Sequence, residues 1–262
     1  MVDDALPAPV ALAGMNALIV GGTSGIGLET ARQLVDAGAA GVVVAGRDEA
    51  RGARALRRLG EPEGVLFVAG DAGAPVGAKQ LIATAIDRLG HIDLLVCSTA
   101  PAVLPDLFAR TAADDIPAML TDLTLPPMLL ASAILPHMRA RRSGVIVNVA
   151  SDAGKSATPG EAVIGAGMAA IVMFSRTLAM EAKRDGIRVN VMTPSLVAGT
   201  ETSARILAGG FSQKLFEKAA TMASLGVAEA SDIAAAIVFL ASPAARRLTG
   251  QAISVNGGIS AA

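Results

Sequence analysis

The stretch Gly21-Gly22-Thr23-Ser24-Gly25-Ile26-Gly27 decides the fold, because it lies between a short apolar run and the start of a helical pattern. Glycines at 21, 25 and 27 allow a tight turn, close approach of the backbone to a pyrophosphate, and close helix packing. The N-terminus of the following helix offers unpaired N–H groups to an anion. This context favours a dinucleotide site over an ordinary glycine turn. The residues predicted to bind the cofactor here are Gly21, Thr23, Ser24, Gly25, Ile26 and Gly27.

The rest of the chain alternates continuous apolar runs with helical patterns. The runs cover residues 17–20, 42–45, 65–69, 94–96, 145–149, 189–192 and 252–255. The helical patterns cover residues 25–38, 48–59, 78–89, 128–142, 161–184 and 231–241. Continuous apolar runs are typical of strands buried on both faces, and the alternation predicts a parallel sheet with helices on each side. We therefore predict a single α/β domain over residues 1–262.

Two segments depart from this regular alternation. Residues 197–225 form a connection that is longer than usual and rich in Gly, Ala, Ser and Thr, so we predict a substrate lid there. The stretch Ala162–Ala182 contains only Arg176 and Glu181 as charged residues and is apolar nearly all round. Such a helix is expected to be covered by its own sheet and by another subunit, the alternative being a fully internal helix.

Composition and charge exclude several classes of partner. The chain has 262 residues, 22 Lys and Arg against 23 Asp and Glu, and therefore a net charge of −1, which attracts neither nucleic acid nor an anionic membrane. The charge-free stretch 5–28 contains prolines and glycines that break a spanning helix, and the stretch 162–175 is too short to span a bilayer. An acidic N-terminus (residues 1–4) and the single Cys97 favour a cytoplasmic protein.

The residues after the second and third predicted strands bear on the choice of cofactor. Gly46-Arg47-Asp48 follows the second strand, and a glycine followed by an arginine leaves room for a 2′-phosphate and supplies its partner. NADP(H) is therefore favoured over NAD(H), with a solvated Arg47 as the alternative. Asp71 is a candidate for the adenine amino group, or else forms a turn. Because His91 and His137 show no metal-ligand spacing, we predict no metal site.

Several further motifs resemble the short-chain dehydrogenase/reductase family, and the resemblance covers nearly the whole chain. The matching segments are Ile92-Asp93-Leu94-Leu95-Val96, residues 144–151, Gly186-Ile187-Arg188-Val189-Asn190, Pro194, residues 248–251 and residues 255–258. The resemblance implies a doubly wound Rossmann fold with a seven-stranded parallel sheet. It also implies a homotetramer or dimer built partly on the apolar helix, with NAD(P)-linked chemistry on a small carbonyl or alcohol. Pro194 is the matching cofactor-binding residue.

The family's chemistry uses a Ser, a Tyr, a Lys and an Asn, and the sequence departs from this set. Ser151 matches the Ser, but Ile164 stands at the Tyr position and Met168 at the Lys position. Thr124 stands at the Asn position. The chain contains no Tyr at all, so no shift of register restores the proton donor. Loss of a positioned acid typically costs about 10²- to 10⁴-fold in rate.

Two functions remain open at this stage. The first is an NADP(H)-linked oxidoreductase with a different proton donor, for which Lys155 and Glu161 are candidates, although both are expected on the solvated surface. Cys97 is expected to be a small buried side chain rather than a nucleophile. The second is a catalytically silent subunit or nucleotide-responsive scaffold that pairs with an active relative through the apolar helix.

Overall fold

The computed structural model describes residues 12–100 and 103–261; residues 1–11, with the acidic N-terminal segment, 101–102 and 262 lie outside it. The strands form a seven-stranded, wholly parallel sheet in the order β3-β2-β1-β4-β5-β6-β9. Their bounds are β1 Asn16–Val20, β2 Gly41–Gly46, β3 Val65–Ala69, β4 Leu94–Cys97, β5 Gly144–Val149, β6 Ile187–Met192 and β9 Ala252–Ile253. The predicted fold class is confirmed.

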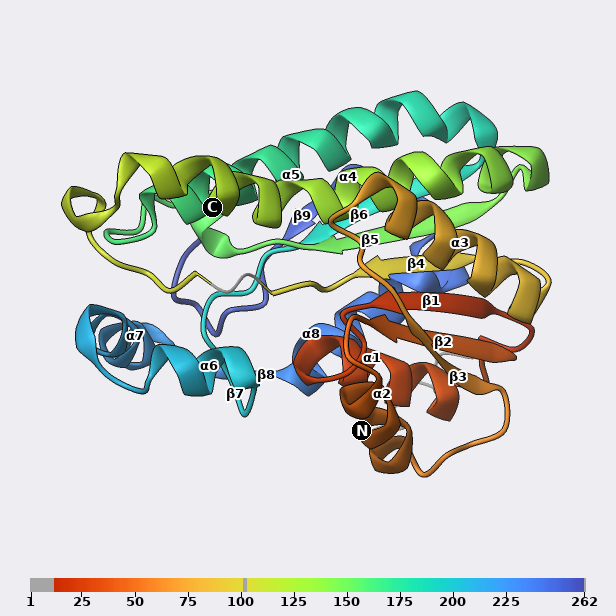
Figure 1. Cartoon of the computed structure of the whole chain (residues 1–262), viewed down its shortest axis with the longest axis horizontal. Helices are drawn as coiled ribbons and strands as arrows, with labels where there is room; N and C mark the ends of the chain where they lie inside the picture. The colour runs from red at the N-terminus through yellow and green to blue at the C-terminus, as the bar shows by residue number, and fades with distance from the viewer. Residues whose placement is uncertain (1–11, 101–102, 262) are drawn as a thin grey trace, which may run out of the picture.

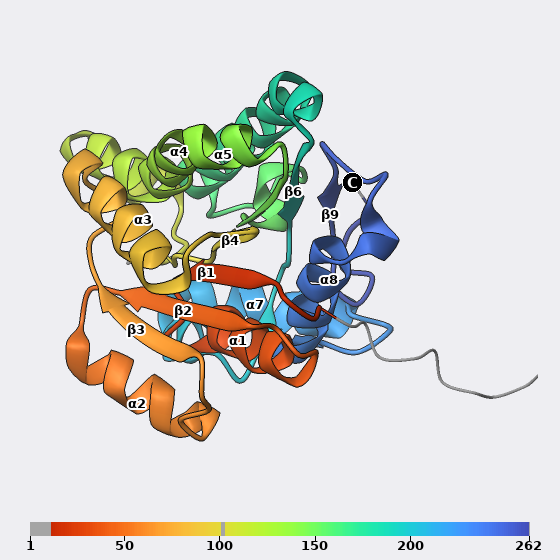
Figure 2. The ribbon, with the colours of Figure 1, turned by 90° about the vertical axis from the view of Figure 1, so that its right-hand side faces the viewer.

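Helices cover both faces of this sheet (Figures 1 and 2). One face carries α3 (Pro75–Leu89), α4 (Ile116–Arg141) and α5 (Ala162–Ala182), and the other carries α1 (Gly25–Asp36), α2 (Glu49–Leu59) and α8 (Ala230–Ala241). Successive strand residues point to opposite faces, so Leu18 packs with the first group and Ile19 with the second. Two apolar clusters therefore hold the sheet between its helix layers.

The helix predicted over residues 128–142 is much longer than the sequence indicates. It begins at Ile116 and continues through Pro126, Pro127 and Pro136. Prolines normally break a helix because they lack an N–H group and clash with the preceding turn. Here Pro126 and Pro127 are buried, as is Leu123 one turn earlier. Packing of this face outweighs the local helix-breaking tendency.

Residues 197–225 form a compact addition at the side of the domain. They contain β7 (Val197–Ala198), α6 (Glu201–Ile206) and α7 (Gly210–Met222), and β7 pairs in parallel with β8 (Ala228–Glu229). Leu196, Ile206 and Phe216 make a small apolar cluster of their own. Figure 1 shows α6 and α7 set apart from the two helix layers. The chain enters this addition after β6 and leaves it through β8.

Two helical segments are long and apolar enough, by length and composition alone, to cross a membrane. They are residues 113–141 and 162–185. The second exceeds the charge-free stretch 162–175, because the helix continues past Arg176 and Glu181. In the fold these segments lie side by side over one face of the sheet, and each buries a face there (Figure 1). Core helices of this kind pass the same test.

Gly186→Ala should destabilise the chain more than Gly38→Ala. Both glycines have positive φ, +74° and +83°, so each substitution adds about 1 kcal/mol of backbone strain. A Cβ on Gly186 would lie 2.3 Å from the Arg142 carbonyl oxygen, whereas a Cβ on Gly38 meets nothing within 4 Å. We expect the difference to be about 1–3 kcal/mol in the free energy of unfolding measured with urea. Equal losses would contradict this packing at the start of β6.

Candidate active site

The glycine loop is shaped by contacts that only glycine permits. A Cβ on Gly27 would lie 2.3 Å from the Gly21 carbonyl oxygen, and a Cβ on Gly21 would lie 2.3 Å from the Ser98 carbonyl oxygen. Gly25 adopts a φ of +52° at the first residue of α1. Ser24 is the N-cap of α1, and its side chain makes no capping hydrogen bond. The first-turn N–H groups therefore face the loop without a side-chain partner, as a bound pyrophosphate requires.

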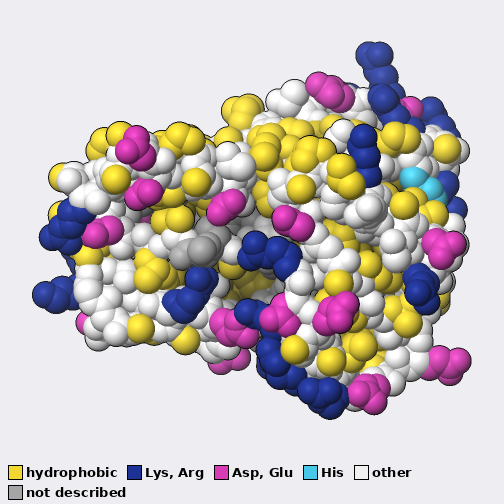
Figure 3. All heavy atoms as spheres, in the orientation of Figure 1, with side chains coloured by type: hydrophobic (Ala, Val, Ile, Leu, Met, Phe, Trp, Pro, Cys, Tyr) yellow, Lys and Arg dark blue, Asp and Glu magenta, His cyan; other side chains and the backbone are white. Residues whose placement is uncertain are grey.

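The parallel strands deliver the predicted site residues to one edge of the sheet. Gly21 follows β1, Arg47 follows β2, Ser151 follows β5 and Pro194 follows β6. Ligands of open parallel sheets bind at this carboxyl edge. Figure 3 shows that the surface is hollowed between the α6–α7 addition and the domain body, with acidic and basic side chains around the hollow. The fold thus brings together the residues that the sequence assigns to one site.

The end of β2 presents two arginines near the glycine loop. Arg47 is exposed, and in the described part of the chain its guanidinium has no recorded hydrogen bond or ion pair. A Cβ on Gly46 would lie 3.1 Å from the Thr23 methyl carbon, so a glycine here lets the end of β2 pack closely against the glycine loop. Arg51, on the first turn of α2, donates to the Ser24 hydroxyl at 3.3 Å. The residues present therefore fit the phosphate groups of a dinucleotide.

Asp71 lies after the edge strand β3 and is exposed. Its carboxylate accepts a hydrogen bond from the Gly73 N–H at 3.0 Å, which is the turn-forming role that the sequence left open. A contact with the adenine amino group stays a prediction.

The hydroxyl groups of Ser151 and Thr124, which the sequence aligns with the family's Ser and Asn, form hydrogen bonds with nearby backbone groups. The Ser151 Oγ accepts a hydrogen bond from the Ala153 N–H at 3.3 Å, and Ser151 itself is half-buried. The Thr124 hydroxyl donates to the Leu120 carbonyl oxygen at 2.7 Å, within its own helix. Because its single proton is committed there, Thr124 is poorly placed to order a water molecule for a proton relay.

Ile164 and Met168, which the sequence aligns with the family's Tyr and Lys, are core side chains. Ile164 and Met168 are 6% and 7% exposed and pack in one apolar cluster with Leu123, Ala150, Ile171, Val172 and Val191. The backbone of Met168 is also closely approached, since a Cβ on Gly154 would lie 2.7 Å from its carbonyl carbon. Beside Ile164 lies a cavity of about 30 Å³. That volume holds about one water molecule.

Lys155 and Glu161 differ from the expectation that both are solvated. Lys155 is half-buried and donates to the Ser254 hydroxyl at 2.7 Å and to the Ala252 carbonyl oxygen at 3.3 Å. Glu161, the N-cap of α5, is only 8% exposed. Burial raises the pKa of Glu161 to about 7, and the charge of Asp152 adds to the increase. For Lys155 the expectation was wrong because its partners belong to the C-terminal segment, about 100 residues away. For Glu161 it was wrong because the folded chain buries the N-cap of α5.

Asp152 connects that C-terminal segment to the active-site loop. Its buried carboxylate accepts hydrogen bonds from the Ser254 hydroxyl at 3.0 Å, the Asn256 amide at 2.8 Å and the Ser260 hydroxyl. Its N–H donates to the Pro194 carbonyl oxygen at 2.9 Å. This network fixes the loop that begins at Ser151. It was missed from the sequence because its partners lie about 100 residues away.

Cys97 is buried at the end of β4, as expected. Burial raises the pKa of its thiol to about 11, although a hydrogen bond with Thr99 opposes the shift. The thiol therefore stays protonated near neutral pH and is a poor nucleophile. No group of three or more metal-ligating side chains occurs among the described residues.

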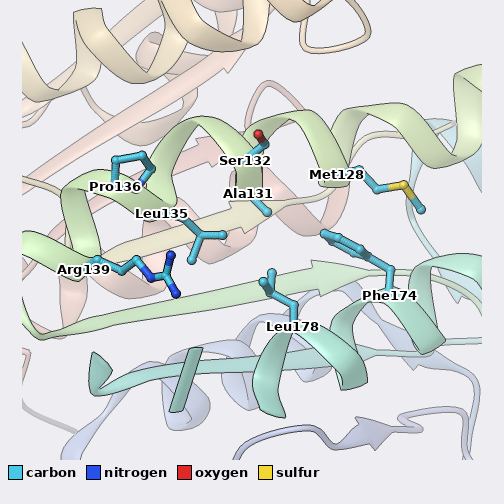
Figure 4. A pocket seen from close by; sticks show the side chains of 8 residues that line it. All are labelled: Met128, Ala131, Ser132, Leu135, Pro136, Arg139, Phe174 and Leu178. Carbon is cyan, nitrogen blue, oxygen red and sulfur yellow. The ribbon is translucent and has the colours of Figure 1, made fainter. Parts of the chain in front are cut away.

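A wide apolar groove lies between α4 and α5, away from the glycine loop. It has a volume of about 530 Å³. Figure 4 shows Phe174 and Leu178 of α5 pointing toward Leu135 and the neighbouring α4 side chains. On the same helix, Met173 and Met180 are each 59% exposed. The apolar helix is thus covered by the sheet on one side only, which excludes the fully internal alternative.

Comparisons with known proteins agree with this architecture. The family model described as enoyl-(acyl carrier protein) reductase matches residues 20–260. The human protein named dehydrogenase/reductase SDR family member 2, mitochondrial, is 33% identical over 94% of this chain and 86% of its own length. The 3-oxoacyl-(acyl-carrier-protein) reductase FabG of Chlamydia pneumoniae is 30% identical over 95% of this chain and 98% of its own.

Solved structures show the same fold. A short chain dehydrogenase/reductase family protein has 34% identity and a TM-score of 0.81, covering 94% of this chain and 97% of that one. Levodione reductase, at 24% identity, has a TM-score of 0.85 and covers 94% of this chain and 97% of its own, which shows likeness of fold alone. With its sheet order, its glycine loop and a family match over nearly its full length, the chain belongs to the short-chain dehydrogenase/reductase family of oxidoreductases.

Proposed function

We propose that this chain is an NADP(H)-binding subunit that does not use the family's Tyr–Lys proton relay. The observation that carries the proposal is the burial of Ile164 and Met168 in one apolar cluster. Neither side chain has a proton to donate or a charge to offer. The glycine loop and the arginines after β2 keep the features that dinucleotide binding needs. The chain therefore keeps the residues for dinucleotide binding and lacks those for the Tyr–Lys proton relay.

The roles of the remaining residues follow from their positions. The N–H groups at the start of α1 hold the pyrophosphate, and Arg47 pairs with the 2′-phosphate. A bound NADPH supplies a hydride to a carbonyl group. The Ser151 hydroxyl is placed to orient a small carbonyl or alcohol, since it lies at the carboxyl end of β5. No group at positions 124, 164 or 168 then delivers the proton.

A second candidate function is an oxidoreductase with a different proton donor. The buried carboxyl of Glu161 favours it, because a pKa of about 7 keeps much of this group protonated near neutral pH. Glu161 lies three residues before Ile164, at the start of the same helix. Its substrate would again be a carbonyl or alcohol, in keeping with the name of the 3-oxoacyl-(acyl-carrier-protein) reductase relative.

The apolar groove between α4 and α5 supports an oligomeric subunit. It opens beside the exposed Met173 and Met180, and Figure 3 shows hydrophobic side chains gathered over α4. We propose a homodimer or homotetramer across this groove, or a hetero-oligomer with an active relative. The sedimentation mass of the purified chain, alone and mixed with such a relative, distinguishes them. Residues 197–225 remain a proposed lid, and a cytoplasmic location stays a prediction from the sequence.

NADPH should bind more tightly than NADH, and Arg47→Ala should reduce this preference. A hydrogen bond to a charged phosphate is worth about 1.5–3 kcal/mol, so we expect about 10- to 100-fold weaker NADPH binding. NADH binding should change less than about twofold. Nicotinamide fluorescence titration measures both. Arg58→Ala, on the last turn of α2, is the control. If neither NADPH nor NADH binds, the proposed function is overturned.

The double substitution Ile164→Tyr with Met168→Lys should create carbonyl-dependent oxidation of NADPH where the natural chain has little or none. A positioned acid contributes about 10²- to 10⁴-fold in rate. Ile164→Leu with Met168→Leu keeps the apolar cluster and serves as the control, with no gain in rate and little loss of stability. Turnover is measured over a panel of small carbonyl compounds. Rapid turnover by the natural chain would contradict the proposed loss of the relay.

Stability should fall as the pH rises through the pKa of Glu161. Its folded pKa of about 7 lies above the ordinary value of 4.5, so its favourable contribution is full below pH 4.5 and lost above pH 7. The loss is about 3 kcal/mol. Glu161→Gln should remove this part of the pH dependence of urea unfolding, while Glu181→Gln, at an exposed position of α5, should keep it.

The same variant tests the second candidate function. If Glu161 donates the proton, Glu161→Gln lowers any carbonyl-dependent NADPH oxidation by about 10²- to 10⁴-fold, the residual rate lacks the pH-rate limb near 7, and nucleotide binding stays intact. Unchanged turnover in Glu161→Gln would exclude Glu161 as the donor.

A further inference from the structure

The ion pair between Arg51 and Glu201 joins two segments that lie 150 residues apart. Arg51 belongs to the first turn of α2, beside the end of β2. Glu201 is the first residue of α6, in the addition formed by residues 197–225. The same guanidinium nitrogen, Nη2, also donates to the Ser24 hydroxyl of the glycine loop at 3.3 Å. One arginine thus connects the addition to the nucleotide-binding loop.

Local structure holds both partners in position. The Asp48 carboxylate, at the N-cap of α2, accepts from the Arg51 N–H at 2.9 Å. Thr200 and Ser203 form a reciprocal cap at the start of α6, in which the Thr200 hydroxyl accepts from the Ser203 N–H at 3.0 Å. The Thr200 methyl carbon lies 3.4 Å from the position of a Cβ on Gly25. The N-terminus of α6 therefore rests on the glycine loop itself.

The pair is placed so that a phosphate can compete for it. The side chains of Arg51 and Glu201 are 40% and 60% exposed, and exposed ion pairs are weak. A phosphate dianion is a stronger acceptor for a guanidinium than a single exposed carboxylate. Arg47 lies four residues before Arg51 in the sequence and is exposed, and the described residues give its guanidinium no hydrogen bond or ion pair. Both arginines therefore follow the carboxyl end of β2, and Arg51 also touches the glycine loop through Ser24.

We propose that Arg51 is a second ligand for the 2′-phosphate of NADP(H), and that Glu201 occupies it until the nucleotide binds. The inference rests on the proposed NADP(H) binding and adds the residue that couples binding to the addition. Binding exchanges the Glu201 carboxylate for the phosphate, so that α6 is released from the glycine loop. NADH, which lacks the 2′-phosphate, leaves the ion pair in place.

The test measures dissociation constants for NADPH, NADH and adenosine 2′,5′-bisphosphate on the full chain. Arg51→Met should weaken NADPH and the bisphosphate about tenfold and change NADH less than twofold. Glu201→Gln should tighten NADPH and the bisphosphate about two- to fivefold, because the competing carboxylate is gone. Arg54→Met, on the next turn of α2, and Glu217→Gln, on α7, are the controls and should change none of the constants.

The double variant separates competition from a general effect of charge. In the Arg51→Met background, Glu201→Gln should have no further effect on NADPH, since the two residues act through one ion pair. Weakening of all three ligands by Glu201→Gln would mean that the pair closes over bound nucleotide, which overturns the exchange. If the natural chain prefers NADPH but Arg51→Met and Glu201→Gln bind all three ligands as the control variants do, the further inference is overturned and the proposed function stands. Failure of the natural chain to bind NADPH at all would overturn the proposed function as well.

Discussion

The close approach of α1 to the glycine loop is the constraint on which the rest of the site depends. The Gly21 carbonyl oxygen occupies the place of a Gly27 side chain, and Ser98 at the end of β4 occupies the place of a Gly21 side chain. The loop therefore contacts both the helix that follows it and a neighbouring strand. Since β1 lies in the middle of the sheet, this contact also aligns the carboxyl ends of β2, β4 and β5 around the loop.

Ile164 and Met168 contribute to the fold through close apolar packing. A buried ionisable pair carries a desolvation cost, whereas well-packed apolar side chains of similar volume are often neutral or stabilising in its place. Ile164 and Met168 extend the contact between α5, Leu123 of α4 and Val191 of β6. The surrounding backbone is close-packed at Gly154 and Gly167, so the helix stays firmly docked. The nucleotide half of the domain keeps its shape without the relay.

Buried polar groups near the same helix are held by the C-terminal segment. Asp152 accepts three side-chain hydrogen bonds from residues 254–260, and Lys155 donates to Ser254. These partners compensate the burial of the Asp152 charge, which otherwise costs several kcal/mol. Burial raises the pKa of the neighbouring Glu161 to about 7, and the charge of Asp152 adds to the increase. The segment after β9 thereby fixes the geometry of a loop that precedes it by about a hundred residues.

The sequence alone predicted the sheet and its helix layers, and it aligned Ile164, Met168 and Thr124 with the family's Tyr, Lys and Asn. These follow from short-range information: continuous apolar runs, glycine spacing and residue identity at motif positions. The tertiary structure decided the rest, including the start of α4 at Ile116, the burial of Glu161 and the pairing of Arg51 with Glu201. Judged by local preference alone, prolines are expected in turns and charged side chains are expected in solvent. Only the folded chain shows which distant segments cover them, because burial and ion pairing depend on neighbours in space.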